Sequence, residues 1–242
     1  LEGGLRGDLT WVEPTHSHTA TPLPRRADFA EVGGNLRLTW KPTTGLELFT
    51  GIARGVRTPD PEELYIDRPY EPMMAMMEQE PWIGNPDLKP TKNYEADLGV
   101  KYASGRYFIN ASIFVSYLTD FINITSRPLS MKQNIMTYEN VTATMWGSEL
   151  GAQYALPADL FLKGSLSYVE GENRDGHRPL SEIPPLHGSI GARYDNGTAF
   201  VEVTENLSAR QGRLDSVLQE QATAAYATTE LKAGYRYKAI SL

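Results

Sequence analysis

The chain has 242 residues, of which 40% are hydrophobic and 22% are charged, and its formal net charge is −7 at pH 7. A negative balance without any lysine- or arginine-rich run argues against nucleic-acid binding, which requires a concentrated basic surface. The chain contains no cysteine, which excludes disulfides, thiolate metal sites and cysteine nucleophiles. No run of about 18 apolar residues predicts a transmembrane helix, and the first residues do not read as a signal peptide.

Alternation of apolar and polar residues predicts β-strands in almost every part of the chain. In the clearest run, every second residue from Tyr94 to Tyr102 is apolar or aromatic, and the residues between them are polar, charged or glycine. This period of two is the signature of a strand with two different faces. The predicted strands lie at 5–12, 35–40, 46–52, 92–102, 107–117, 149–154, 160–168, 186–194, 199–203 and 227–237.

The length of these strands favours a membrane β-barrel. Tyr107 and Tyr117 close one apolar run and stand ten positions apart, which spans about 33 Å at about 3.3 Å per residue. Tilted by about 45°, such a strand rises about 23 Å, close to the apolar band of an outer-membrane barrel. Tyrosine suits both edges of that band because its ring is apolar and its hydroxyl reaches water. Strands of soluble proteins are mostly about five or six residues long.

The connections between the predicted strands alternate between short and long. Short turns are predicted at 42–45, 104–105, 157–159 and 195–197, with a reversal near 238–239; long connections are predicted at 13–30, 57–91, 123–137, 171–185 and 208–224. Bacterial outer-membrane barrels have short periplasmic turns and long extracellular loops. We therefore predict an all-β fold: about ten antiparallel meander strands of a transmembrane β-barrel in the bacterial outer membrane, with strands that cross it repeatedly.

A soluble β-sandwich or up-and-down barrel is the structural alternative. It would have to bury the charged residues that alternate with the apolar ones, and burial of unpaired charge is costly. A wide barrel instead exposes that face to a hydrated lumen. The charged residues in question are Glu95, Asp97, Lys101, Glu149, Lys163, Glu230, Lys232 and Arg236.

Four segments resemble segments of a known family, the TonB-dependent outer-membrane receptors. The first reads ARGVRTPD followed by ELY, the second GNPDLKP, and the third ends in IPP. They lie, in family order, at Ala53 to Tyr65, at Gly84 to Pro90, at Gly171 to Asn173 together with Leu180 to Pro185, and at Glu220 to Gly234.

The resemblance implies a 22-stranded barrel with an N-terminal plug, driven by TonB and the proton-motive force. Residues 1–242 would then be the C-terminal part of the barrel domain, and the plug, the TonB box, the first half of the barrel and the last strand would lie outside them. The implied partners are TonB, reached through the plug, a metal-chelate or siderophore ligand, and outer-membrane lipid.

Catalytic chemistry is not indicated. The four histidines are His16, His18, His177 and His187, and no Ser/His/Asp arrangement or phosphate-binding loop accompanies them. The adjacent carboxylates of Glu62-Glu63 are expected to be solvated. We predict that the protein is not an enzyme and has no cofactor.

The longest loop offers a metal-binding hypothesis. It contains four methionines, and thioether sulfur is a soft donor that favours Cu(I); two histidines of another loop would add imidazole nitrogens. The predicted copper ligands are Met73, Met74, Met76, Met77, His16 and His18. The alternative is that these methionines are flexible apolar filler.

Uptake of a ferric siderophore is the role that the resemblance favours, and copper import is the alternative. The residues predicted to contact ligand in the loops are Tyr65, Arg68, Tyr70, Met73, Met76, Met77 and Trp82, and the predicted lumen-facing residues are Glu95, Asp97, Arg106 and Glu149. Arg54, Arg57 and Arg68 would attract an anionic chelate, although Arg57 is rather expected to pair with Asp60 or Glu63 and fix the exit of its strand. A passive porin would share the alternation of the strands, and an adhesion-type β-protein would share the long loops, so both classes stay open.

Overall fold

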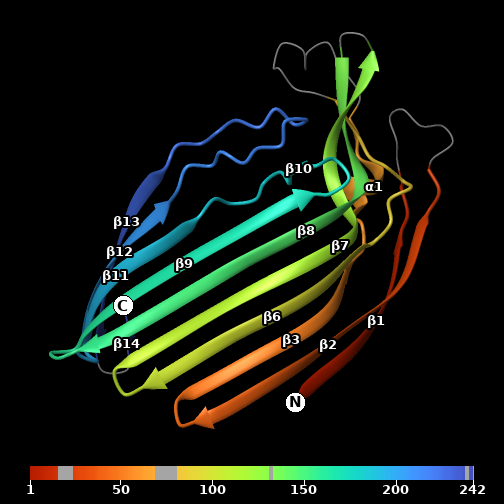
Figure 1. The fold of residues 1–242 in the computed structure, drawn as a ribbon. Coiled ribbons are helices and arrows are strands. Elements are labelled where there is room, and N and C mark those ends of the chain that lie inside the picture. Colours follow the sequence, from red (N-terminus) through yellow and green to blue (C-terminus); the bar gives the residue numbers. More distant parts are fainter. Residues whose placement is uncertain (16–23, 69–80, 131–132, 238–239, 242) are drawn as a thin grey trace.

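The computed structural model describes residues 1–15, 24–68, 81–130, 133–237 and 240–241. One curved antiparallel sheet dominates the molecule (Figure 1), and its strand order follows the chain order, so the sheet is a meander. The long strands are β1 (Glu2–Val12), β2 (Ala27–Thr43), β3 (Leu46–Arg57), β6 (Thr91–Ser104), β7 (Tyr107–Ser130), β8 (Gln133–Leu156), β9 (Leu160–Asn173), β11 (His187–Asp195), β12 (Ala199–Ser208) and β13 (Tyr226–Tyr237). The short elements are α1 (Pro61–Tyr65), β4 (Asp67–Arg68), β5 (Trp82–Ile83), β10 (Arg178–Pro179) and β14 (Ile240–Ser241).

The sheet has one apolar and one polar face, as the alternation predicted. Leu98 of β6 lies beside Ile113 of β7, and both side chains are more than half exposed, at 55% and 56%. The residues between these positions, such as Asp97 and Ser112, lie on the opposite face. We call the two sides the apolar face and the polar face. A folded chain that exposes an apolar surface of this extent buries it against something other than water.

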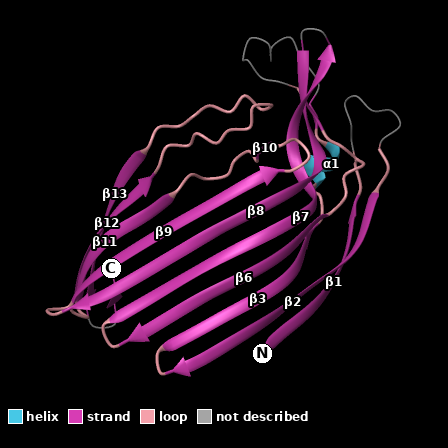
Figure 2. Ribbon diagram, in the orientation of Figure 1, coloured by secondary structure: helices cyan, strands magenta, loops and turns pink. Residues whose placement is uncertain are grey.

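Aromatic residues mark both edges of the apolar face. Tyr107 and Tyr154 stack with their ring centroids 4.7 Å apart near the short turns. Trp146 and Tyr168 meet edge to face at 5.3 Å near the opposite end. We call these the turn end and the loop end of the sheet. Figure 2 shows the strands running between the two ends, with helix α1 at the loop end.

The predicted short turns at the turn end are confirmed. Gly45 adopts a φ of 84°, and a Cβ at this position would lie 2.1 Å from the carbonyl oxygen of Ala103, so the turn requires glycine. Ala158 and Asp159 both have positive φ, at 62° and 58°, as tight hairpins do. The reversal predicted near 238–239 lies outside the described residues.

The long connection predicted at 123–137 is wrong. β7 and β8 are each 24 residues long and stay paired across most of this range. A bulge shifts their register between Leu118 and Phe121, and Asp120 within it has a φ of 54°. The bulge adds a residue and so reverses which positions face each side. The alternation therefore changes phase at the bulge. For this reason the sequence pattern did not predict that the strand continues beyond it.

The long connection predicted at 13–30 is shorter than expected, because β2 already begins at Ala27. The connection predicted at 57–91 contains α1, β4 and β5. No helix in the described ranges is long and apolar enough to cross a membrane.

The sheet contains a seam between β2 and β3 near the loop end. The two strands pair from Thr43 up to Gly34, which lies opposite Arg54. Beyond this point 27–33 pair only with β1, and 55–57 pair only with β6. The guanidinium of Arg54 lies at the start of the seam, where it donates to the carbonyl oxygen of Val32 and to the carboxylate of Glu31 at 3.2 Å.

Candidate functional site

The loop between β3 and β6 is anchored at its start by an ion pair. Two guanidinium nitrogens of Arg57 lie 2.9 and 2.8 Å from the two carboxylate oxygens of Glu63. The same carboxylate accepts the backbone N–H of Asp60 at 2.8 Å, which caps the first turn of α1. The predicted pairing of Arg57 is thus confirmed. The positive charge of Arg57 is balanced by a carboxylate of the same chain.

The GNPDLKP segment packs the second half of this loop against α1 and β8. Gly84 approaches so closely that a Cβ would lie 2.6 Å from the backbone of Leu64, and its N–H donates to the carbonyl of Ile66 at 2.7 Å. The side-chain amide of Asn85 donates to the carbonyl of Tyr138 at 3.0 Å. Leu88 is buried against Leu64 in a small apolar core. The segment therefore positions the loop.

Asn140 of β8 fastens the end of the loop to the bulge in β7. Its side-chain oxygen accepts the N–H of Lys89 at 2.8 Å, and its amide donates to the carbonyls of Lys89 and Asp120 at 3.0 and 2.7 Å. The hydroxyl of Thr91 donates to the same Asp120 carbonyl at 3.1 Å. The carbonyl of Asp120 in the bulge thus accepts hydrogen bonds from two side chains, those of Asn140 and Thr91.

The predicted ligand-contact residues that the structure describes lie around this loop. The hydroxyl of Tyr65 is 2.8 Å from the carbonyl of Arg25 and 3.3 Å from that of Val12, so it ties α1 to the β1–β2 connection. Burial raises the pKa of Tyr65 above its ordinary value. Arg68 pairs with Trp82 between β4 and β5. Tyr70, Met73, Met74, Met76, Met77, His16 and His18 lie outside the described residues.

The predicted lumen-facing residues fall into two groups. Glu95, Asp97 and Glu149 occupy strand positions on the polar face; Glu95 accepts the hydroxyl of Ser116 at 2.9 Å. Arg106 does not belong to a strand, because it lies in the turn between β6 and β7.

An acidic pocket of 300 Å³ lies between α1 and the 181–182 segment, and sequence reasoning missed it. Its wall includes Asp60, Glu62, Glu63 and Glu182, together with Tyr138. Burial first, and then the charges of Glu62 and Glu63, raise the pKa of Tyr138. Within the described ranges, no three histidine, aspartate or glutamate side chains are grouped closely enough to hold a metal ion.

The loops at 174–186 and 209–225 are joined by a second ion pair that the sequence did not reveal. Arg178 lies 3.0 Å from the carboxylate of Asp215, which is fully buried. The backbone N–H of Asp215 donates to Glu220 at 2.6 Å, and the other carboxylate oxygen of Glu220 accepts the N–H of Glu182 at 3.0 Å.

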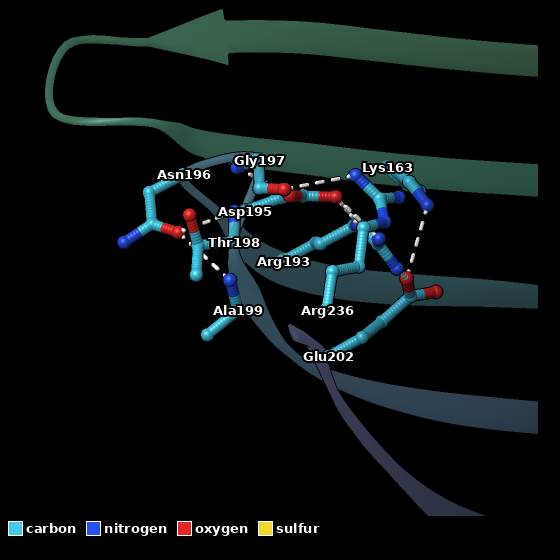
Figure 3. A network of polar contacts seen from close by, with 9 residues as sticks. All are labelled: Lys163, Arg193, Asp195, Asn196, Gly197, Thr198, Ala199, Glu202 and Arg236. Carbon is cyan, nitrogen blue, oxygen red and sulfur yellow. Dashed lines mark hydrogen bonds and ion pairs between the residues drawn. The ribbon is translucent and has the colours of Figure 1, made fainter. Parts of the chain in front are cut away.

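A charged network occupies the polar face at the turn end (Figure 3). Arg193 contacts Asp195 and, at 2.9 Å, Glu202, which also accepts from Lys163 at 3.2 Å. The guanidinium of Arg236 donates to the carbonyl of Gly197 at 3.0 Å. These residues come from four neighbouring strands: Lys163 and Arg193 pair with Glu202 and Asp195, and Arg236 binds a backbone carbonyl.

A curved meander with an exposed apolar face, aromatic edges and a charged opposite face is the wall of a transporter or receptor β-barrel, a class that is distinct from enzymes. Residues 1–242 match the family described as "TonB dependent receptor-like, beta-barrel" along their whole length. The chain belongs to this family, whose members are proteins of the outer membrane.

Individual relatives have different cargoes. The chain is 24% identical over 181 residues to the "Probable hemoglobin and hemoglobin-haptoglobin-binding protein 4" of Haemophilus influenzae, an alignment that covers 67% of the chain and 17% of that protein. It superposes on the "Copper transporter OprC" with a TM-score of 0.81 and 25% identity, covering 98% of the chain and 38% of OprC. For a mutant of the ferric enterobactin receptor PfeA from Pseudomonas aeruginosa the TM-score is 0.66 at 18% identity, with 88% and 34% covered. The chain thus spans well under half of each relative, and the last likeness shows the fold alone.

Proposed function

We propose that the chain is the C-terminal part of the barrel wall of a TonB-dependent importer, whose strands cross the outer membrane repeatedly and which takes up a scarce metal as a chelate. The observation that carries this proposal is the family match over 1–242. The partner that supplies energy is TonB, which acts through a plug outside this chain. The loop end of the sheet binds the cargo, and the polar face lines its path.

The first cargo that we propose is a ferric siderophore. The anchors at Arg57, Asn85 and Asn140 hold the two ends of the loop between β3 and β6 in fixed positions. Arg68 and Trp82 pair between β4 and β5 at the loop end, where a guanidinium donates to the oxygen atoms of a chelate and an aromatic ring packs on its apolar parts.

Copper is the second candidate. The copper transporter OprC matches the chain over 98% of its length with a TM-score of 0.81, compared with 0.66 for the ferric enterobactin receptor. The sequence of the longest loop also contains Met73, Met74, Met76 and Met77, and thioethers prefer Cu(I) to hard cations.

Calorimetric titration of the full-length receptor in detergent separates the two cargoes. Cu(I), Cu(II) and a panel of ferric siderophores are titrated into the wild type and into a variant with leucine at the four methionine positions. Copper binding that the leucine variant loses supports the second cargo, and binding of a ferric complex by both proteins supports the first. Failure of every metal species to bind would overturn metal import. Uptake that persists in a strain without TonB would instead indicate a passive porin.

A further inference from the structure

A cavity of 420 Å³ opens on the polar face of β9, β11, β12 and β13, beside Pro184 and Pro185. This volume lies within the range of about 300–1,000 Å³ that small-molecule sites occupy. One cross-strand row crosses the cavity: Ser165 lies opposite Ser189, which lies opposite Asn206, which lies opposite Thr228. Four strands at a spacing of about 4.8 Å give the row a length of about 14 Å.

Every member of this row carries a hydrogen-bonding group without formal charge. The hydroxyls of Ser165 and Ser189 are 2.7 Å apart and bond to each other. Asn206 and Thr228 have exposed side chains. An amide and a hydroxyl both donate and accept, so the row complements a ligand that has several oxygen atoms.

The next row towards the loop end adds an imidazole and an aromatic ring. His187 lies beside Ser208, and Ser208 lies beside Tyr226. The Nδ1 atom of His187 is 3.0 Å from the carbonyl oxygen of Pro185. A carbonyl only accepts, so Nδ1 carries a hydrogen, and the tautomer with this single hydrogen has Nε2 as an acceptor. The ring of Tyr226 offers an apolar surface next to these polar groups.

On the polar face, the lysine, arginine, aspartate and glutamate residues of the same four strands lie nearer the turn end. Lys163 precedes Ser165 by two residues and binds Glu202, which also binds Arg193 (Figure 3). Lys232 pairs with Glu230 at 3.0 Å. The charges nearest the cavity are therefore three cations paired with three carboxylates, and Arg236 lies farther away, at the carbonyl of Gly197, so the uncharged row borders charges that are already balanced. A charged ligand would lose hydration there without gaining an opposite charge, whereas an uncharged ligand exchanges water for matched hydrogen bonds.

We propose that this cavity is a lumen-facing subsite for an uncharged, oxygen-rich small molecule. The proposal rests on the proposed import function and names the class of chelate that it carries. Among ferric complexes it selects neutral hydroxamate-type chelates over anionic catecholate-type chelates.

The test uses the full-length receptor in detergent and two probes, a neutral ferric trihydroxamate complex and an anionic ferric tricatecholate complex. The Asn206→Leu/Thr228→Val variant removes two groups of the row at nearly constant volume. We expect its dissociation constant for the neutral complex to rise about tenfold, the size of effect that loss of hydrogen bonds produces. Thr39→Val, which removes a hydroxyl from the polar face of β2, leaves binding unchanged.

A charge added to the row provides a second readout that a loss of folding cannot imitate. Asn206→Lys places a cation in the cavity, and we expect it to raise the affinity for the anionic complex and lower that for the neutral one. Equal binding of the neutral complex by wild type and both variants would overturn the subsite while leaving metal import intact. Binding of copper but of neither ferric complex would also overturn the subsite and leave metal import intact. Failure of all metal species to bind would overturn the proposed import function itself.

Discussion

Arg57 and Glu63 form a two-point ion pair at the place where β3 leaves the sheet, with N–O distances of 2.9 and 2.8 Å. Planar guanidinium and carboxylate groups that meet in this way fix orientation as well as distance. Since the same carboxylate caps α1 through Asp60, one contact sets both the exit of the strand and the start of the helix.

We expect Arg57→Ala to loosen α1. The side chain is 45% exposed, so the solvent-screened pair contributes only about 1 kcal/mol, which corresponds to about fivefold faster hydrogen exchange. Hydrogen exchange of residues 60–66 measures this change. Arg127→Ala, which removes one 3.5 Å contact to Glu139, serves as the control. Unchanged exchange in 60–66 would contradict the anchoring role.

Asn140→Ala should have a larger effect, because it leaves the carbonyl of Asp120 and the backbone of Lys89 without the amide that satisfies them. Loss of these bonds costs about 2 kcal/mol locally. Hydrogen exchange should rise at 89–91 and at 120–122 together, because one side chain serves both segments. Substitution of exposed Asn134 on the same strand should leave both segments protected. A rise in only one of them would show that the segments are not coupled.

Leu64→Ala removes the centre of the small core beneath α1. The side chain is fully buried, and truncation of such a leucine costs about 2–5 kcal/mol. Limited proteolysis should therefore cut the loop between β3 and β6 faster than in the wild type. Leu98→Ala on the apolar face, where detergent replaces lipid, should leave proteolysis of this loop unaffected. Equal rates in all three proteins would show that the core does not hold the loop.

Asp215→Asn should release the loop at 209–225 from the loop at 174–186. The substitution leaves Arg178, which is only 18% exposed, with a distant 3.8 Å contact to Glu139, and a broken buried pair costs about 3 kcal/mol. Trypsin should then cleave faster after Arg210 and Arg213. Glu172→Gln, which removes an exposed contact to Arg174, is the matched control. Resistance to trypsin equal to that of the wild type would contradict the tether.

The regular part of the fold was predictable because alternation records which face each residue occupies. It succeeded from Tyr94 to Tyr117, where register and pattern agree. It failed beyond Leu118, because a single bulge residue, Asp120, inverts the phase. A conformation of that kind depends on Thr91 and Asn140, which are distant in the chain.

The site was predictable only where its partners are near in sequence. Arg57 and Glu63 stand six positions apart and were paired in advance. Arg178 and Asp215 stand 37 positions apart, and the row from Ser165 to Thr228 requires the register of four strands. Serine and threonine on a strand are ordinary surface residues until that register aligns them.

The seam beside Arg54 divides the loop end of the wall into two parts, and each part is hydrogen-bonded to a different neighbouring strand. Residues 27–33 keep their ladder with β1, and 55–57 keep theirs with β6, so no backbone hydrogen bond of the ladder crosses from one part to the other. The contacts that cross come from side chains, notably those of Arg54 and Tyr65. A displacement of the β1–β2 end therefore breaks side-chain contacts alone, and the strand register survives it unchanged.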